Sequence, residues 1–244
     1  MKRGKNMLEK YKNKVIAHRG LYDNVIIPEN SLRAFKSAIT ENYPIEIDIH
    51  LTKDNNLVVF HDHNLKRMTE KPLVIENLTI NDLKEIKLLD TKEKIPTLEE
   101  VLKLVDQKVL IIIEIKANNN EELIVKTLLE KLSKYHGEII IHSFNKKVVK
   151  ILKKEKTNYK IGLLISESTD KKKFKLFQTS ISDINYAKPD FLSVSKKLLR
   201  KKHLKKYFDK LPIFVWTIKK ETEIKRIDNE NYIYICDNLP YKND

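Results

Sequence analysis

The tripeptide His18-Arg19-Gly20 follows directly after a short apolar run that begins at Val15. An imidazole can exchange protons near neutral pH, and a guanidinium offers a planar fork of donors that matches phosphate oxygens. The same residues could also form an ordinary basic loop at the end of a strand. The choice between these interpretations depends on whether other strands end in the same way.

A second polar strand end is expected at residues 45–50, which read IEIDIH. Side chains alternate across a strand, so the isoleucines share one face while Glu46, Asp48 and His50 share the other. A strand of a parallel sheet is covered on both faces, and a half-polar strand there is costly unless its polar face serves a site.

The strand expected at Val109–Lys116 repeats this pattern. Its isoleucines at 111, 113 and 115 lie on one face, and Glu114 and Lys116 lie on the other at its carboxyl end. One such strand could be an edge strand with its polar face in water, or a Glu–Lys pair that satisfies itself. Three strands with polar carboxyl ends favour an active site, because active sites of parallel barrels lie at that end.

The carboxylates of Glu46, Asp48 and Glu114 would repel one another at short range unless a cation lies among them. Ligands that are all oxygen select a hard ion, Ca²⁺ or Mg²⁺, over zinc or copper. We therefore expect one divalent cation, Ca²⁺ or Mg²⁺, as the cofactor.

Two histidines are expected at the same rim: His18, and His61 after the apolar run Leu57–Phe60. They could take and give a proton near neutral pH, while Arg19 and Lys116 bind phosphate oxygens. A cation, two imidazoles and two basic side chains around one opening are typical of a site that cleaves a phosphoester.

The order of elements predicts the fold. The expected strands are Val15–His18, Ile45–His50, Val109–Lys116, Glu138–Ser143, Lys160–Ile165, Phe191–Val194, Ile213–Thr217 and Tyr232–Cys236. The expected helices are Ser31–Glu41, Thr97–Asp106, Glu121–Lys134, Lys146–Glu155, Lys171–Ser180, Lys196–Phe208 and Lys220–Asn229. Strands that alternate with helices indicate an α/β protein with a parallel sheet, and eight of them favour a closed (β/α)₈ TIM barrel.

Two irregularities are expected in this barrel. Residues 63–95 lack a clean period in their first half and predict a short insertion after strand 2, with a short helix at Asn81–Leu89. The five residues PYKND at the end cannot form an ordinary closing helix, so the last helix is expected to be truncated or missing. Because no linker or low-complexity stretch divides the chain, residues 1–244 are expected to form a single domain.

The cysteine content and the apolar runs of the sequence indicate the cellular compartment. The chain has 244 residues and one cysteine, Cys236, which excludes an internal disulfide and fits a reducing compartment. The longest apolar run, Val109–Ile113, is too short to span a bilayer, and the charged N-terminus has no apolar core of a signal peptide. We expect a cytoplasmic protein.

The net charge of +14 is uneven: residues 1–120 carry 20 Lys+Arg and 18 Asp+Glu, and residues 121–244 carry the remaining 28 and 16. Lysines scattered over helices are most simply a solvated surface. Zinc-finger spacing, aromatic RNA-binding strands and Walker glycine loops are all missing from the sequence, which disfavours a nucleic-acid partner.

Several short motifs together resemble one family. They are HRG at His18–Gly20, PENS at Pro28–Ser31, EIDIHLTKD at Glu46–Asp54, FHD at Phe60–Asp62, IEIK at Ile113–Lys116, SF at Ser143-Phe144 and WT at Trp216-Thr217. Their order and spacing resemble those of the glycerophosphodiester phosphodiesterase family over nearly the whole chain. Each motif alone is weak, whereas the joint pattern is specific.

The resemblance implies a (β/α)₈ barrel that hydrolyses glycerophosphodiesters to glycerol 3-phosphate and an alcohol. It assigns metal ligation to Glu46, Asp48 and Glu114, catalysis to His18 and His61, phosphate contacts to Arg19 and Lys116, and a place in the pocket lining to Trp216. The implied partner is a small-molecule glycerophosphodiester or lysophospholipid.

Two features depart from the family pattern. Asn55-Asn56 stands where the family has glycine after the TKD turn, and asparagine tolerates the left-handed backbone of such a turn. The terminal TD-x-P pattern becomes Cys236 to Pro240, with one extra residue, so the rim near the last strand is expected to differ. His50 is expected to support the site, and His142 to be a core or rim histidine whose polar atoms are satisfied, and not a catalyst.

Other functions remain compatible with the same barrel. One is a lysophospholipase D-like or phospholipase C-like activity on lysophospholipids or phosphoinositides. Another is a non-catalytic module that binds phosphodiesters or membranes. Binding alone requires no acid–base pair, so the presence of two histidines with three carboxylates argues against a non-catalytic module.

The basic second half suggests a weak partner, an anionic membrane. Residues 196–210 are expected to form one helix whose apolar side covers the barrel and whose lysines, Lys201, Lys202 and Lys205 among them, face outward near Lys171–Lys173. Such a surface can hold a protein near anionic lipid, with an attraction that salt screens.

Overall fold

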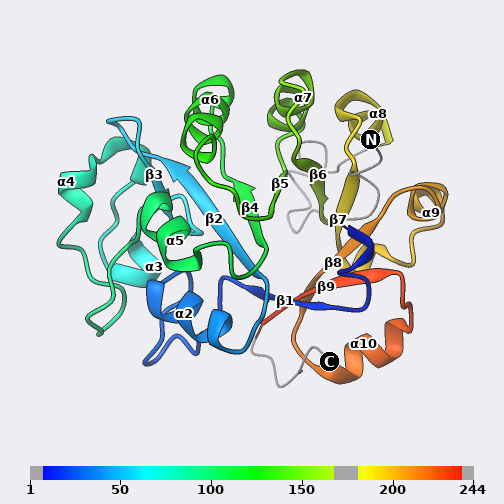
Figure 1. Cartoon of the computed structure of the whole chain (residues 1–244), viewed down its shortest axis with the longest axis horizontal. Coiled ribbons are helices and arrows are strands. Elements are labelled where there is room, and N and C mark those ends of the chain that lie inside the picture. The colour runs from blue at the N-terminus through cyan, green and yellow to red at the C-terminus, as the bar shows by residue number, and fades with distance from the viewer. Residues whose placement is uncertain (1–7, 168–180, 238–244) are drawn as a thin grey trace.

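Eight parallel strands close into a ring in the computed structural model, which describes residues 8–167 and 181–237 (Figure 1). The ring consists of β1 (Val15–His18), β2 (Ile45–Leu51), β4 (Ile111–Ile115), β5 (Ile139–Ser143), β6 (Lys160–Ile165), β7 (Phe191–Ser195), β8 (Ile213–Ile218) and β9 (Tyr232–Cys236). Strand β1 closes it by pairing with β2 on one side and β9 on the other. This confirms the predicted (β/α)₈ barrel.

Alternation along the strands divides the core into two layers. The isoleucines at 45, 47 and 49 of β2, and at 111, 113 and 115 of β4, point outward and pack with the helices. A smaller set fills the barrel interior, including Ile112 of β4, Ile140 of β5, Phe191 of β7 and Phe214 of β8. The interior positions of β2 and β4 nearest the carboxyl ends are left to polar side chains, as the alternation predicts.

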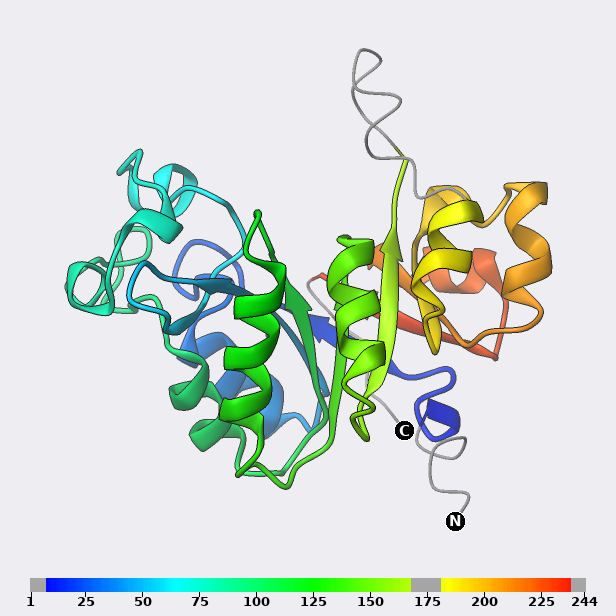
Figure 2. The same cartoon turned by 90° about the horizontal axis from the view of Figure 1, so that it is seen from above.

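Helices cover the outside of the barrel. They are α2 (Leu32–Thr40), α5 (Leu98–Val105), α6 (Glu121–Leu132), α7 (Lys146–Lys154), α8 (Ile181–Ala187), α9 (Lys202–Phe208) and α10 (Glu221–Ile227). Ser31 caps α2, Thr97 forms a capping box with Glu100 at the start of α5, and Asn145 caps α7. Figure 2 shows α6 and α7 side by side outside the strands.

The insertion after β2 has a small core of its own. Strand β3 (Leu57–Val59) pairs antiparallel with β2, and α3 (Lys66–Thr69), a 3₁₀ turn at Ile75–Asn77 and α4 (Ile80–Leu83) follow. The prediction of a helix at Asn81–Leu89 is wrong about where the helix ends, because α4 ends at Leu83. The apolar residues Leu83, Ile86 and Leu88 are all buried, and their spacing of three and then two does not fit one face of a helix.

The single helix expected at Lys196–Phe208 is also wrong. A 3₁₀ turn covers Lys196–Leu198, Lys201 is extended, and α9 begins only at Lys202. Leu198 and Leu204 both reach the core, and residues six apart lie on different sides of one α-helix, so the chain breaks between them.

Two further expectations fall outside the described residues. The whole helix expected at Lys171–Ser180 lies in the segment 168–180, and α8 begins at Ile181. The expected loss of the last helix concerns residues after Asp237. Among the described helices, none is both long enough and apolar enough to cross a bilayer.

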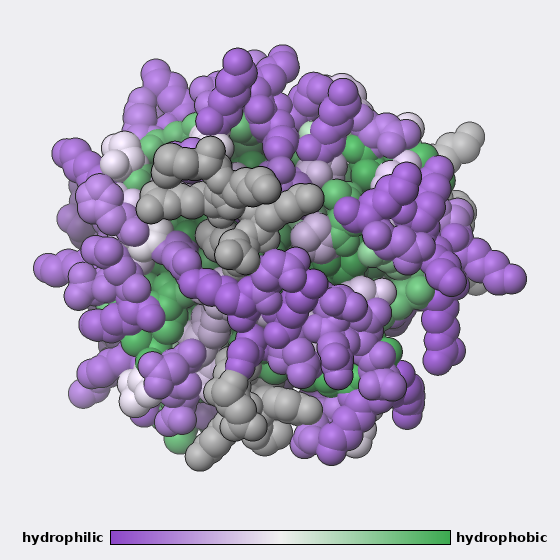
Figure 3. All heavy atoms as spheres, turned by 45° about the vertical axis from the view of Figure 1, so that its right-hand side comes forward, coloured by the Kyte–Doolittle hydropathy of each residue, from purple (hydrophilic) through white to green (hydrophobic). Residues whose placement is uncertain are grey.

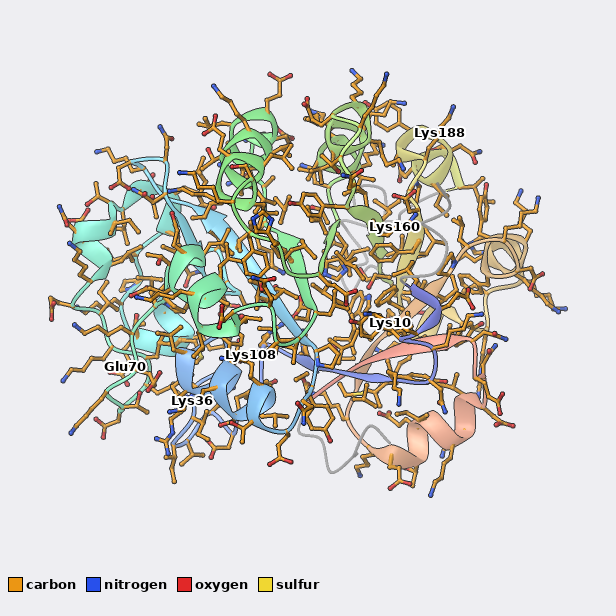
Figure 4. The ribbon with its side chains drawn as sticks, in the orientation of Figure 1. Lys10, Lys36, Glu70, Lys108, Lys160 and Lys188 are labelled. Carbon is orange, nitrogen blue, oxygen red and sulfur yellow. The ribbon has the colours of Figure 1, made fainter. Side chains whose placement is uncertain are left out.

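Charged side chains line the periphery, including the labelled Lys36 on α2, Glu70 in the insertion and Lys188 after α8 (Figure 4). The carboxyl ends of the barrel strands, by contrast, direct charged side chains inward. That inward set forms the candidate site.

Candidate active site

The corner after β1 explains the tripeptide His18-Arg19-Gly20. Both Arg19 (φ 59°) and Gly20 (φ 84°) have left-handed backbone, so the chain turns sharply as the strand ends. A Cβ at Gly20 would lie 2.7 Å from the backbone carbonyl carbon of Ala34 in α2, which leaves room for glycine alone. The turn keeps His18 and Arg19 at the opening of the barrel.

The PENS segment holds charged side chains in place around the opening. Glu29 accepts a hydrogen bond from Arg19 at 2.7 Å and two from Arg67 of α3, at 2.7 and 3.0 Å. Burial would raise the pKa of Glu29, but Arg67 and Arg19 outweigh it and lower the pKa to about 2. Asn30 donates to Asp48 at 2.9 Å, which joins this segment to β2.

Asp48 is fully buried and is surrounded by cations. Lys116 Nζ lies 2.9 Å from its Oδ1, and Arg19 Nε lies 3.3 Å from its Oδ2. Burial would raise the pKa of Asp48, but Lys116, His61 and Arg19 hold it well below its ordinary value. Lys116 also pairs closely with Glu114. Arg19 and Lys116, the two side chains expected to bind phosphate, therefore form ion pairs with carboxylates in this structure.

A second group of side chains converges on one point. Among the described residues, ligand atoms of Glu46, Glu114 and His142 all lie within 4.8 Å of one another. Glu46 is buried, and burial first, then the neighbouring Asp48, raises the pKa of its carboxyl group. Its Oε2 has no hydrogen-bond partner among the described residues, and neither has either ring nitrogen of His142.

This arrangement fits a divalent cation. Two predicted metal ligands, Glu46 and Glu114, contribute to the converging group, while the third, Asp48, pairs with Lys116 and Arg19. A cation would neutralise the buried like charges and satisfy the unpartnered oxygen of Glu46. His142 was expected in the core or at the rim. It is buried as expected, but it is not satisfied, because neither ring nitrogen has a hydrogen-bond partner among the described residues. Burial lowers the pKa of His142 to about 4, so the imidazole is neutral.

Each predicted catalytic histidine has an aspartate on its Nδ1 atom. Nδ1 of His18 lies 2.6 Å from Asp237 at the end of β9, and Nδ1 of His61 lies 2.6 Å from its neighbour Asp62. The carboxylates fix the orientation of both rings and leave Nε2 for proton exchange. Nε2 of His18 faces Glu46, 3.9 Å from Oε2.

Further contacts support the two aspartates. Tyr22 donates to the same Asp237 oxygen at 3.0 Å, and Arg67 donates to Asp62 at 2.6 Å. The role of Asp237 was missed by the sequence analysis, which regarded Cys236 to Pro240 only as a departure from the family pattern. Asp237 nevertheless contacts His18, and residues from 238 onward lie outside the described chain.

The site residues open onto one cavity of about 140 Å³. All predicted site residues except Asp48 line it, together with His142 and Phe144. Trp216 stands edge-on to the Phe144 ring, with 5.6 Å between the ring centroids and an interplanar angle of 89°. A groove of about 960 Å³ adjoins this cavity and shares His61, Glu114, Lys116 and Phe144 with it.

Two smaller expectations are confirmed. His50 contacts Glu76 at 3.3 Å and the backbone oxygen of His61 at 3.3 Å, so it supports the segment that carries His61. Asn55 adopts left-handed backbone (φ 59°), and the TKD turn forms without glycine.

A family model described as the glycerophosphoryl diester phosphodiesterase family matches residues 18–235. The chain belongs to this family. The match begins at His18 and includes every predicted site residue. As a family member the chain is an enzyme, a phosphodiesterase.

Individual phosphodiesterases agree with this assignment. A glycerophosphodiester phosphodiesterase of Caldanaerobacter subterraneus is 39% identical over 169 residues, which cover 63% of this chain and 67% of that protein. A human lysophospholipase D is 32% identical over 176 residues, covering 65% of this chain and 53% of that protein. A phosphodiesterase of Oleispira antarctica, solved with the product sn-glycerol-3-phosphate, shares the fold with a TM-score of 0.80, 21% identity and 96% of each chain covered.

Proposed function

We propose that the protein hydrolyses glycerophosphodiesters to glycerol 3-phosphate and an alcohol by a two-histidine acid–base mechanism. The observation that carries the proposal is the pairing of His18 with Asp237 and of His61 with Asp62 at the opening that also holds Glu46 and Glu114. Two oriented imidazoles can serve both ends of a phosphodiester cleavage. The product bound to the Oleispira antarctica enzyme supports the same substrate class.

Arg19 and Lys116 bind the phosphate in this proposal. Both side chains are largely buried and already positioned by Asp48, Glu29 and Glu114. The neighbouring carboxylates raise the pKa of both side chains despite the burial, so both stay positively charged. A diester phosphate would share their donors and bring its phosphorus between the two histidines.

Proton transfer is divided between the histidines. One imidazole takes the proton of the attacking oxygen, and the other donates a proton to the departing alkoxide. Asp237 and Asp62 stabilise whichever ring carries the positive charge, because each accepts from Nδ1. The departing alcohol leaves through the adjoining groove of about 960 Å³.

Glu46, Glu114 and Asp48 would hold one divalent cation at this site. When bound, such an ion polarises a phosphoryl oxygen and neutralises charge that develops in the transition state. The three carboxylates by themselves favour Ca²⁺ or Mg²⁺. The buried, unpartnered oxygen of Glu46 supports this placement.

Lysophospholipase D-like cleavage is a second candidate. The adjoining groove carries apolar side chains, Phe144 and Leu163, beside the polar Asn118 and Lys146. Phe144 is 42% exposed, so it offers an apolar surface to the part of a substrate beyond the phosphate. The acyl chain of a lysophospholipid would contact this surface, whereas a deacylated glycerophosphodiester has no acyl chain to place there.

A panel of pure substrates distinguishes these candidates. Glycerophosphocholine, glycerophosphoethanolamine, glycerophosphoglycerol and a lysophospholipid are each incubated with the protein, and glycerol 3-phosphate, lysophosphatidic acid and the free alcohol are measured. We expect glycerol 3-phosphate from the deacylated diesters. Turnover of the lysophospholipid alone, with lysophosphatidic acid as product, would contradict the main proposal and favour the second.

We also propose weak association with anionic membranes through the basic surface of α9. Lys201, Lys202 and Lys205 are exposed there, and hydrophilic side chains cover most of the face seen in Figure 3. The run Lys171–Lys173, expected nearby, lies outside the described residues. A surface of this kind concentrates the enzyme where deacylated or lysophospholipids are released.

Sedimentation with vesicles tests the membrane proposal. Phosphatidylglycerol vesicles should retain the protein at low salt and release it at moderate salt, and the K201E/K202E/K205E variant should bind less. Phosphatidylcholine vesicles are the control. Equal, negligible binding to both lipids at low salt would contradict the proposal.

We also propose that the protein is cytoplasmic and that its partner is a small molecule and not a nucleic acid.

The single cysteine, Cys236, is buried at the end of β9, and burial raises the pKa of its thiol. A buried thiol of this kind is a small apolar side chain and not a nucleophile.

A further inference from the structure

His142 is a polar side chain whose position the acid–base mechanism does not use. It lies on β5, is 1% exposed, and stands with Nε2 3.6 Å from Oε1 of Glu46. Neither ring nitrogen has a hydrogen-bond partner among the described residues. A buried imidazole whose nitrogens have no partner costs free energy, so these nitrogens indicate a ligand at this position.

The strand register explains why His142 faces the carboxylates. Asp48 of β2 pairs with Glu114 of β4, and Glu114 pairs with His142 of β5, so the three side chains form one row across neighbouring strands. Paired residues of parallel strands point to the same face, here the barrel interior. The imidazole therefore belongs to the same layer of side chains as two expected metal ligands.

The next two strands continue this row and limit where the ring can go. Gly162 of β6 pairs with His142 and has no side chain, and a Cβ there would lie 2.2 Å from the ring of Phe191. The Phe191 ring takes up that space, with its centroid 6.4 Å from the centroid of His142. Apolar packing thus bounds the imidazole on the β6–β7 side and leaves it facing Glu46 and Glu114.

We propose that His142 is a direct ligand of the same divalent cation, so that the site prefers a first-row transition ion such as Mn²⁺ or Co²⁺ to Mg²⁺ or Ca²⁺. Ligand atoms of Glu46, Glu114 and His142 lie within 4.8 Å of one another, which is the spacing of donors around one ion. The inference rests on the proposed metal dependence and specifies which ion the site takes.

The chemistry of the donor set supports this preference. Carboxylates alone suit Mg²⁺, Ca²⁺ and Mn²⁺, whereas an imidazole nitrogen adds affinity for transition ions and little for the alkaline-earth ions. The nitrogen therefore distinguishes this site from a site made of oxygen alone.

Calorimetric titration of the metal-free full-length protein with Mg²⁺, Ca²⁺, Mn²⁺ and Co²⁺ measures the preference. We expect wild type to bind Mn²⁺ and Co²⁺ at least about tenfold more tightly than Mg²⁺, and His142→Gln to lose about tenfold or more for the transition ions while changing little for Mg²⁺. His203→Gln, an exposed substitution on α9, is the matched control and should match wild type.

A spectroscopic measurement does not depend on activity. Spin-echo spectra of the Mn²⁺-loaded protein should show modulation from a directly bound ¹⁴N nucleus. The modulation should disappear in His142→Gln and persist in His18→Ala, whose ring also faces Glu46. Thermal unfolding of each variant shows that it is folded, and His142→Asn replaces the glutamine variant if that one does not fold.

The outcomes separate this inference from the proposed function. Equal losses for Mg²⁺ and Mn²⁺ in the His142 variant, or ¹⁴N modulation that survives the substitution, would overturn His142 as a ligand and leave metal dependence intact. Failure of wild type to bind any of the four ions would contradict the metal site itself.

Discussion

His18→Ala and His61→Ala are each expected to lower kcat by about 10²–10⁴-fold, the usual loss when a general acid or base is removed. The reason is that each ring is fixed by an aspartate, Asp237 or Asp62, and presents Nε2 at one opening. Neither ring fills the apolar core, since His18 and His61 are both partly exposed, so the fold should tolerate both changes.

A substrate with an activated leaving group tells the two histidines apart. Nitrophenolate leaves without a proton, so a glycerol nitrophenyl phosphodiester should restore turnover in the variant that lacks the acid and not in the variant that lacks the base. Steady-state kcat on this substrate and on glycerophosphocholine is the measurement.

The control is His136→Ala, an exposed substitution in the loop before β5, which should leave kcat unchanged. Aspartate variants provide an independent check. Asp237→Asn should lower kcat with little change in KM, because it disturbs the orientation of His18 and not the phosphate contacts. Losses of only a few-fold in both histidine variants would refute the two-histidine mechanism.

Glu46→Gln is expected to remove most activity without lowering thermal stability in the absence of metal. Loss of a ligand withdraws charge stabilisation worth several kcal/mol from the transition state, which corresponds to at least about 10³-fold in kcat. Glutamine keeps the shape of the side chain and removes a buried charge that lies near Asp48 and Glu114. The metal-free fold should therefore keep or raise its unfolding midpoint.

Two measurements on the same preparation check this prediction: kcat at saturating metal, and the unfolding midpoint in excess chelator. Wild type should gain stability when metal is added, and the Glu46→Gln variant should gain much less. Glu122→Gln, an exposed substitution on α6, is the matched control. A stable variant with unimpaired activity would argue that Glu46 is not a ligand.

The barrel and the inward carboxylates could be predicted from the sequence because alternation along a strand is a local property. In β2 the isoleucines at 45, 47 and 49 alternate with the carboxylates, and in β4 the isoleucines at 113 and 115 flank Glu114. This alternation fixes the faces without knowledge of the partner strands. The structure accordingly brings Glu46 and Glu114 into one cavity with both histidines.

Contacts made by closure of the ring could not be predicted. Asp237 and His18 are 219 residues apart in the chain and meet only because β9 lies beside β1. His142 follows three isoleucines and precedes Ser143 in β5, a pattern typical of a structural core histidine. Only the β4–β5 register, which the sequence does not specify, places it beside Glu114.

The predictions for two irregular segments were wrong for a different reason. The helices expected at Asn81–Leu89 and Lys196–Phe208 were inferred from helical composition, but local packing determines the structure of both segments. Ile86 and Leu88 complete the small core of the insertion, and Leu198 and Leu204 each reach the main core from separate turns. Tertiary contacts override propensity in such short elements.

Release of glycerol 3-phosphate, measured before chelation, after exhaustive chelation and after metal is restored, tests the central claim most directly. A metal-dependent phosphodiesterase should release glycerol 3-phosphate and alcohol in equal amounts from glycerophosphodiesters. It should lose this activity when the metal is removed and regain it when a divalent cation is added back. Full activity after exhaustive chelation, or no glycerol 3-phosphate from any glycerophosphodiester with metal present, would contradict the account.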